Sequence, residues 1–246
     1  MFGNITFAPP EVKIALIVAF AIIAIVSYLL GSISFAVIFT KKFAHTDVRE
    51  HGSGNAGMTN VMRTAGKLPG ILTFLGDFLK GTASSALGMI LINPLTNALV
   101  LAQGKNFTGE YVFPVIAGAF AGLFCLIGHM WPIFFGFRGG KGVATIVGLA
   151  VSFSPLTSLT CFALFGVLLL ITKTVSLSSI IAVASATPVH LIFFKAQEYP
   201  LFTENSAWVV SLLIATMSVL IIARHHENIV RLFKGTERKI GSKKKG

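Results

Sequence analysis

Long apolar runs separated by short polar segments constrain the fold of this chain more than any other feature of its sequence. A helix needs about 20 predominantly apolar residues to cross the hydrocarbon core of a bilayer. Within that core a helix satisfies its own backbone hydrogen bonds, which irregular chain cannot do. The runs predict seven transmembrane spans, at residues 12–40, 68–92, 113–135, 143–153, 156–171, 175–194 and 206–223. We therefore expect an all-α polytopic membrane protein in which residues 1–246 form a single domain.

Composition agrees with this class and excludes others. Hydrophobic residues make up 54% of the chain and charged residues only 12%, and the mean hydropathy is +0.81. These values lie outside the range of an ordinary soluble domain. A net charge of +11 can indicate nucleic-acid binding, but the basic residues here lie between apolar runs, so we expect no nucleic-acid partner. Cys125 and Cys161 fall within apolar runs, which predicts packing and neither a disulfide nor a metal site.

The segments between the runs differ in character. Gly31-Ser32 interrupts the first run, and residues 43–67 form a basic, Gly-rich segment typical of a loop or a re-entrant element. The N-terminal segment has no basic stretch before its apolar run, so we expect the first span to be retained. The remaining predicted irregular segments are a mixed loop at 93–112, which includes Pro94, a polar loop at 195–205 and a basic tail at 224–246.

The distribution of Lys and Arg predicts the orientation, because cytoplasmic segments carry an excess of these residues. If the N-terminus lies outside, only Lys13, Lys105 and Lys195 fall on the outer side. The inner side then holds the basic tail and eight other cations, which are Lys41, Lys42, Arg49, Arg63, Lys67, Arg138, Lys141 and Lys173. We therefore expect the N-terminus outside, the C-terminus in the cytoplasm, and the three polar motifs described next on the cytoplasmic face.

The segment from Gly128 to Thr145, GHMWPIFFGFRGGKGVAT, has the residues of a phosphate-binding turn. Arg138 and Lys141 flank two adjacent glycines, and glycine lets backbone N–H groups approach an anion closely. The run that begins at Val143 is predicted to be helical, and its N-terminus would add partial positive charge. The alternative is an ordinary cytoplasmic loop.

Two further polar motifs share that face. Residues 52–55 (GSGN) suit an array of N–H donors, and Arg63 is able to close on an oxyanion. The alternative for these residues is a plain turn. Residues 224–228 (RHHEN) follow the last span. The alternative for these residues is the ordinary excess of basic residues beside the cytoplasmic end of a span. We prefer this alternative for the lysines from Lys239 onward, which we expect to contact anionic lipid.

Asp77 and Lys80 place two charges within the second apolar run, three residues apart and on one face of a helix. Charges in a membrane are costly, and they usually pair with each other or face a polar cavity. The two residues therefore predict either a structural ion pair or a Lys80 that binds phosphate. His129 and Trp131 have a similar ambiguity, because they either join the site or anchor the end of the third span.

Five segments together resemble a known family: GSISFA (31–36), GSGNAGMTNVMR (52–63), GDFLKG (76–81), GHMWPIFFGFRGGKGVAT (128–145) and RHHENIVRLFKGTE (224–237). They are similar to the bacterial acyl-phosphate:glycerol-3-phosphate acyltransferases. The resemblance implies a seven-span enzyme of the bacterial cytoplasmic (inner) membrane without a cofactor. That enzyme moves an acyl chain from acyl phosphate to the sn-1 hydroxyl of glycerol 3-phosphate, giving lysophosphatidic acid and phosphate. This is the first committed step of bacterial phospholipid synthesis, and a functional link to a soluble enzyme that forms acyl phosphate is a further expectation.

The resemblance also implies roles for particular residues. Residues expected to be catalytic are Ser53, Arg63, Lys141, His225 and Asn228. Residues expected to bind phosphate, from the resemblance and from the chemistry above, are Gly52, Gly54, Asn55, Lys80, His129, Arg138, Gly139, Gly140 and Gly142. The sequence departs from the family's pattern at Ser34 (usually proline), Met58 (alanine), Trp131 (Phe or Tyr) and Arg138 (lysine), and none of these changes removes a charge or a hydroxyl.

Two phosphate-bearing substrates bring up to about four negative charges, which the basic side chains of the motifs must oppose. The hydroxyl of glycerol 3-phosphate attacks the acyl carbonyl, and Ser53 or N–H groups stabilise the oxyanion. The general base is His225, His129 or the phosphate of glycerol 3-phosphate. We favour the phosphate, because an activated donor requires little assistance.

Competing signatures are missing from the sequence. Neither of the two aspartates, Asp47 and Asp77, lies five residues after a histidine, as an H-x4-D acyltransferase requires. Gly142 follows Lys141 where a P-loop needs Ser or Thr. Two residues before and two residues after Ser53, where Gly-x-Ser-x-Gly requires glycine, the sequence has His51 and Asn55. A transporter for an organic phosphate or a membrane scaffold are the rival classes, but no internal repeat is visible. We expect no metal and no other cofactor.

Overall fold

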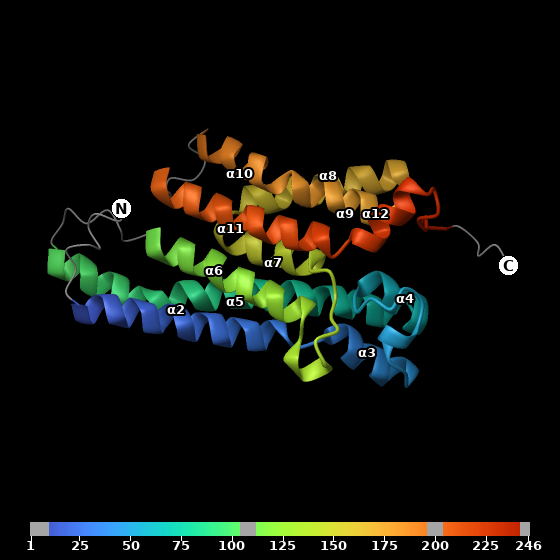
Figure 1. The fold of residues 1–246 in the computed structure, drawn as a ribbon, viewed down its shortest axis with the longest axis horizontal. Helices are drawn as coiled ribbons and strands as arrows, with labels where there is room; N and C mark the ends of the chain where they lie inside the picture. Colours follow the sequence, from blue (N-terminus) through green and yellow to red (C-terminus); the bar gives the residue numbers. More distant parts are fainter. Residues whose placement is uncertain (1–9, 104–111, 196–203, 242–246) are drawn as a thin grey trace.

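The computed structural model describes residues 10–103, 112–195 and 204–241, and all regular structure within them is helical (Figure 1). The elements are α2 (Pro10–Gly31), α3 (Phe35–Ala44), the 3-10 turn η1 (Val48–Glu50), α4 (Met58–Ala65), α5 (Lys67–Gln103), α6 (Val112–Met130), the 3-10 turn η2 (Ile133–Phe135), α7 (Val143–Phe153), α8 (Pro155–Thr172), α9 (Val175–Ala184), α10 (Ala186–Lys195), α11 (Glu204–Ala223) and α12 (His226–Phe233).

Six helical segments in these residues are long and apolar enough to cross a membrane. The helix α7 is also apolar, but its 11 residues extend only about 16 Å, less than the roughly 30 Å of the hydrocarbon core. The expected all-α membrane architecture is confirmed. The count of seven spans and their orientation stay predictions.

The interruption expected in the first run is present. Helix α2 ends at Gly31 and α3 begins at Phe35. The hydroxyl of Ser32 donates to the Tyr28 carbonyl at 2.8 Å. The ammonium of Lys80, from α5, donates to the Ile33 carbonyl at 2.8 Å. A buried cation therefore satisfies a backbone carbonyl within the break.

One predicted boundary was wrong. Helix α5 continues to Gln103 through Pro94, so the loop expected at 93–112 is helical as far as residue 103, and residues 104–111 lie outside the described residues. Packing of the buried Ile92 against α2 and α6 holds this part of the helix despite the proline. Helix α6 ends at Met130, and together with the turn η2 it forms a candidate membrane span from Phe113 to Phe135, as predicted for the third run.

The sixth run is also divided, since α9 ends at Ala184 and α10 begins at Ala186. The ring of Pro188 would clash with the carbonyl four residues earlier, which is that of Ala184. The basic tail contains the amphipathic helix α12, which was not predicted. Most of the polar loop expected at 195–205 and the last five residues of the tail lie outside the described residues.

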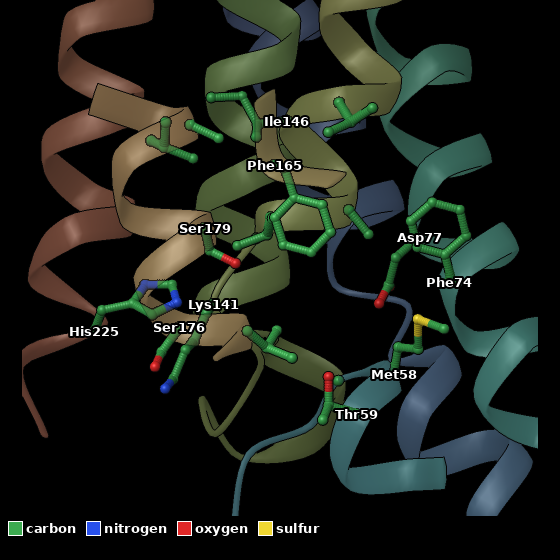
Figure 2. A pocket seen from close by; sticks show the side chains of 18 of the residues that line it. Met58, Thr59, Phe74, Asp77, Lys141, Ile146, Phe165, Ser176, Ser179 and His225 are labelled. Carbon is green, nitrogen blue, oxygen red and sulfur yellow. The ribbon is translucent and has the colours of Figure 1, made fainter. Parts of the chain in front are cut away.

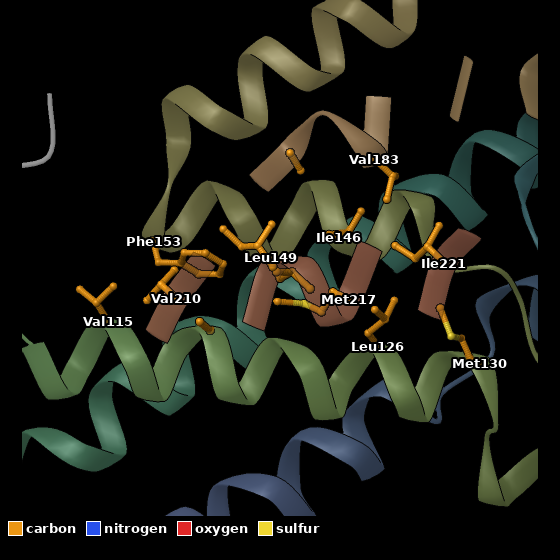
Figure 3. Close-up of a cluster of buried hydrophobic side chains, with 13 residues drawn as sticks. Val115, Leu126, Met130, Ile146, Leu149, Phe153, Val183, Val210, Met217 and Ile221 are labelled. Carbon is orange, nitrogen blue, oxygen red and sulfur yellow. The ribbon is translucent and has the colours of Figure 1, made fainter. Parts of the chain in front are cut away.

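Helix α5 is the centre of one half of the bundle and packs against α2, α3, α4, α6 and α7. A second half consists of α8, α9, α10 and α11, and the largest core cluster joins the halves (Figure 3). In that cluster, Leu126 of α6, Leu149 of α7 and Met217 of α11 are fully buried. The short helix α7 is thus enclosed by the other helices.

Helices α5 and α7 cross with their backbones in contact. A Cβ at Gly81 would overlap the Thr145 carbonyl oxygen and lie 3.0 Å from the Leu149 nitrogen. A Cβ at Gly148 would overlap the Phe78 carbonyl oxygen. Small residues allow this close approach between membrane helices. The crossing fixes where the N-terminus of α7 lies relative to α5, and that end of α7 borders the site.

Candidate active site

A cavity of about 450 Å³ combines a polar end with an apolar channel (Figure 2). Figure 2 shows Lys141, Ser176 and His225 at one end of the cavity and Phe165 and Ile146 beyond them. The polar end is lined by Ser53, Asn55, Asn60, Arg63, Lys141, His225, Asn228, Arg231, Glu237 and Arg238. The apolar channel is lined by Val147, Leu149, Phe153, Phe162, Phe165, Val183, Ile214 and Met217. The arrangement suits a ligand with an anionic head and a long apolar chain.

The Ser53 loop (residues 47–57) is organised by the buried amide of Asn60 in α4. The Asn60 side chain donates to the carbonyls of Val48 and His51, each at 2.9 Å, and accepts from the Ser53 N–H at 3.0 Å. Gly52 and Gly54 have φ angles of 64° and 69°, the left-handed region that glycine tolerates. The loop thereby places the Ser53 hydroxyl at the cavity.

The expected array of N–H donors in this loop is partly used for hydrogen bonds within the protein. The Ser53 N–H is bound by Asn60, the Gly54 N–H donates to the His51 carbonyl at 3.0 Å, and the Gly57 N–H donates to the Asn55 carbonyl at 3.1 Å. Two of the four N–H groups of the predicted array at residues 52–55, those of Ser53 and Gly54, are therefore not available to an anion. Side chains at the cavity, including the exposed Arg63 from the last turn of α4, remain as the donors.

The Lys141 loop (residues 131–142) differs from the predicted cradle in the same way. The N–H groups of Gly139 and Gly140 donate to the carbonyls of Met130 and His129 at 3.2 and 3.1 Å. Neither glycine lines the cavity. Their lack of a Cβ serves close packing, because a Cβ at Gly140 would lie 2.6 Å from the Ala56 carbonyl oxygen of the Ser53 loop.

The positive charge that the Lys141 loop brings to the cavity comes from Lys141 and from the start of α7. Gly142 caps α7 with a φ of 84°, and Val143 and Ala144 line the cavity together with Lys141. The first N–H groups of a helix have no partner within it and carry partial positive charge. Burial, reinforced by Arg231, lowers the pKa of Lys141 to about 8. The ammonium is therefore charged at neutral pH and is easily neutralised above it.

Lys141 is held by the third motif. Its ammonium donates to the side-chain oxygen of Asn228, whose amide nitrogen donates to Glu237 at 2.7 Å. Glu237 also accepts from the Ser176 hydroxyl at 2.9 Å and from Arg231 at 2.8 Å. Although burial works to raise the pKa of Glu237, these hydrogen bonds hold it below its ordinary value. The carboxylate thus fixes which end of the Asn228 amide faces Lys141.

His225 is buried beside this network. Its Nδ1 donates to the Ile221 carbonyl at 2.7 Å, which leaves Nε2 as the acceptor of the neutral ring. Burial, together with the nearby Lys141, lowers the pKa of His225 to about 4. The imidazole is consequently neutral across the physiological range.

The structure brings together most of the predicted site residues but not all of them. Those at the cavity are Gly52, Ser53, Asn55, Arg63, His129, Lys141, Gly142, His225 and Asn228. Those that do not line it are Gly54, Lys80, Arg138, Gly139 and Gly140. Arg138 is exposed. No three His, Cys, Asp or Glu side chains among the described residues lie close enough together to hold a metal ion.

Lys80 forms the structural pair that the sequence offered as an alternative. Its ammonium lies 2.9 Å from the Asp77 carboxylate and donates to the Ile33 carbonyl. Both side chains are almost fully buried. His129 Nδ1 lies 3.4 Å from the same Asp77 oxygen, so the carboxylate connects the buried cation with a histidine of the cavity wall.

Sequence reasoning missed several residues at the cavity, chiefly Ser176, Arg231, Glu237 and Arg238. Arg231 and Glu237 lie within the last of the five family-like segments, which was their only signal. Ser176 stands near the start of an apolar run, where nothing distinguishes it from a packing residue.

Comparisons with known proteins agree with this site. A family model described as glycerol-3-phosphate acyltransferase matches residues 21–235. A glycerol-3-phosphate acyltransferase of Clostridioides difficile is 42% identical over 228 residues, which cover 93% of this chain and 98% of the relative. One from Neisseria gonorrhoeae is 39% identical over 219 residues, covering 89% of this chain and 96% of the relative.

Two solved structures share the fold. They are the glycerol 3-phosphate form and the lysophosphatidic acid form of PlsY, an integral membrane glycerol 3-phosphate acyltransferase. The TM-scores are 0.71 and 0.69 at 37% and 36% identity, each over 90% of this chain and over 96% and 95% of the solved chains. With the matches over nearly the full length and the cavity described above, this chain belongs to the glycerol-3-phosphate acyltransferase family.

Proposed function

We propose that this protein transfers an acyl chain from acyl phosphate to the sn-1 hydroxyl of glycerol 3-phosphate, giving lysophosphatidic acid and phosphate. Family membership supports the acceptor, and the two forms in which the related PlsY was solved agree with this acceptor and product. The observation that carries the proposal is a cavity in which a cationic polar end opens into an apolar channel. Such a cavity can hold two phosphates and an acyl chain at once.

Besides Arg231, Glu237 and Arg238 of the C-terminal segment, two loops contribute to the polar end. Arg63 and Ser53 come from the first loop and the following helix, and Lys141 with the start of α7 comes from the second. We assign the phosphate of the acyl donor to Arg63 and Ser53. We assign the phosphate of glycerol 3-phosphate to Lys141 and the first turn of α7, where a compact ammonium and helix N–H groups favour an anion. The acyl chain then extends along α7, whose cavity-lining residues from Ala144 to Phe153 cover about 14 Å.

The proposed reaction needs no covalent enzyme intermediate. The sn-1 oxygen of glycerol 3-phosphate forms a bond to the acyl carbon, and the bond from that carbon to the phosphate oxygen breaks. Phosphate leaves with the electron pair of the broken bond. In this proposal the Ser53 hydroxyl, which lies at the cavity, donates to the transient oxyanion. Positioning two substrates in one cavity supplies much of the rate enhancement in reactions of this kind.

The proton of the attacking hydroxyl goes to the phosphate of glycerol 3-phosphate in our proposal. A general base works best when its pKa lies near the working pH. The pKa of His225 is about 4, which makes this ring a weak base at neutral pH. A phosphate monoester titrates near pH 6, so the substrate itself is the better acceptor.

We further propose that the protein lies in the bacterial cytoplasmic membrane with the polar end of the cavity towards the cytoplasm. The excess of Lys and Arg in the predicted inner segments supports this orientation. The product lysophosphatidic acid then enters the surrounding membrane lipid. A soluble enzyme that forms acyl phosphate is a functional partner in the same compartment.

The decisive experiment gives purified protein in detergent only acyl phosphate and glycerol 3-phosphate, and measures lysophosphatidic acid. We expect turnover with acyl phosphate and none with acyl-CoA, because the described residues form no soluble domain beside the cavity that could hold the nucleotide. An Asn228→Ala protein purified in the same way controls for contaminating activity, since it leaves Lys141 without its partner. Comparable turnover with acyl-CoA would show that the proposed donor is wrong.

A further inference from the structure

The side chain of Arg49 connects the two loops that hold the proposed substrates. Its Nη1 donates to the Phe135 carbonyl and, at 3.5 Å, to the Arg138 carbonyl. Its Nε and Nη2 donate to the two carboxylate oxygens of Asp47 at 2.9 and 2.7 Å. One guanidinium thus binds a carboxylate of the Ser53 loop and two carbonyls of the Lys141 loop.

Only arginine can make this set of contacts. A guanidinium presents five donors in one plane, whereas an ammonium is a compact point charge. The Arg49 and Asp47 side chains are only 18% and 13% exposed, so the pair is largely shielded from solvent. The hydrogen bonds from Arg49 hold the pKa of Asp47 below its ordinary value, despite partial burial. The pair therefore stays ionised throughout the range in which an enzyme is assayed.

Both loops are stiff on either side of this contact. Asn60 binds the Val48 carbonyl, next to Arg49, and also the Ser53 N–H. In the other loop, the N–H groups of Gly139 and Gly140 are bound within the turn that leads to Lys141. A displacement at Arg49 is therefore transmitted to the separation between Ser53 and Lys141.

We propose that Arg49, oriented by Asp47, is a positioning residue that fixes the Ser53 loop against the Lys141 loop. Arg49 does not line the cavity, so it acts through these loops and not by touching substrate. The inference rests on the proposed function, in which the two loops hold the two substrates. A change of about 1 Å in their separation is expected to cost on the order of 10²-fold in rate.

Arg49→Lys tests the proposal, because it keeps the charge and loses the fork of donors. We expect kcat to fall on the order of 10²-fold, with little change in KM for either substrate. Binding of labelled glycerol 3-phosphate should keep its stoichiometry, which separates misalignment from a loss of folded protein. Asp47→Asn should have the same effect in weaker form. Lys42→Ala, an exposed cation on α3 without a role in the site, is the matched control and should leave kcat unchanged.

Chemical rescue of kcat gives a second measurement, and added guanidinium would not change it if Arg49 only stabilised the fold. Addition of guanidinium at concentrations far below denaturing should restore part of the kcat of purified Arg49→Ala, and ammonium should not. No rescue, together with an Arg49→Lys protein as fast as wild type, would overturn the positioning role.

Hydrogen exchange separates failure of this inference from failure of the proposed function. The amides of Phe135 and Phe137 donate to the Pro132 carbonyl, and those of Gly139 and Gly140 donate to the last two residues of α6. All four amides should exchange faster in Arg49→Lys without any substrate. If wild type lacks the acyltransferase activity, the proposed function fails. Faster exchange in Arg49→Lys then still supports the positioning role of Arg49. If wild type is active and neither exchange nor kcat changes in Arg49→Lys, only the positioning role of Arg49 is wrong.

Discussion

Lys141 carries the titration that most directly affects anion binding at the polar end of the cavity. Burial lowers its pKa to about 8, so the ammonium is present below pH 8 and is lost as the pH rises through that value. We expect KM for glycerol 3-phosphate to rise above pH 8. In Lys141→Arg the guanidinium stays charged, and the rise in KM should move beyond pH 10. A KM profile from pH 6 to 10 for both proteins measures this, and an alkaline rise that is identical in both would contradict it.

His225 allows a different titration to be tested. Its pKa of about 4 places the change in its charge well below the pH at which phosphate titrates. We therefore expect the acidic limb of the kcat profile, near pH 6, to survive in both His225→Ala and His225→Gln. The rate should fall in both, and Gln should restore part of it through a hydrogen bond. If the acidic side becomes flat in both proteins, His225 is the base.

Gly140 is expected to be intolerant of a side chain for a reason of packing. A Cβ there would overlap His129 Nε2 and approach the Ala56 carbonyl oxygen to 2.6 Å, and that carbonyl is backbone that cannot move alone. Gly140→Ala should raise KM for glycerol 3-phosphate more than it lowers kcat. Gly166→Ala in α8 is the control, because nothing lies within 4 Å of its Cβ. Wild-type kinetics in a folded Gly140→Ala protein would remove this packing from the site.

At the scale of helices, the buried Asp77–Lys80 pair supports the break between α2 and α3. Lys80→Met should destabilise the protein by roughly 3–5 kcal/mol, because it leaves the Asp77 charge buried without its partner. Adding Asp77→Leu should recover much of that loss, although the Ile33 carbonyl still lacks its donor. Unfolding in detergent micelles measures both, and a double variant no more stable than the single one would show that the charge is not the cause.

Individual helices were predictable to the extent that local sequence decides them. Gly31-Ser32 signalled the break after α2, and α7 has the limits expected from its apolar run. Pro94 misled the prediction at α5, because packing of Ile92 between α2 and α6 outweighs a local breaker. Helix α12 was missed, because an eight-residue amphipathic helix in a basic tail has no long apolar run to reveal it.

The sequence indicates which types of residue belong to the site, but it does not indicate which groups contact one another. Gly139 and Gly140 were predicted to present their N–H groups to an anion, but these groups donate to backbone carbonyls. Which partner each group finds depends on residues far away in the chain. Lys141 and Asn228 are 87 positions apart, and Arg49 and Phe135 are 86 apart. No local pattern contains such pairs.

At the scale of the whole molecule, orientation can be tested independently of how deep α7 reaches. Helices α7 and α8 form a hairpin, so the chain returns to the same side whether or not α7 crosses completely. We expect a cysteine at Lys195, the end of α10, to react with an impermeant reagent from outside intact cells. A cysteine at Thr64 in α4 should react only after the membrane is opened. The reverse pattern would invert the proposed topology.

The lengths of the helices determine how the protein responds to the thickness of its bilayer. The 37 residues of α5 extend about 55 Å, and even a 40° tilt leaves about 42 Å along the normal, more than the roughly 30 Å core. This helix therefore projects from the bilayer whatever its thickness. The 18 residues of α8 extend only about 27 Å, so a thicker bilayer strains α8 and not α5. Because α8 forms one wall of the apolar channel, we expect lipid thickness to act on the width of that channel.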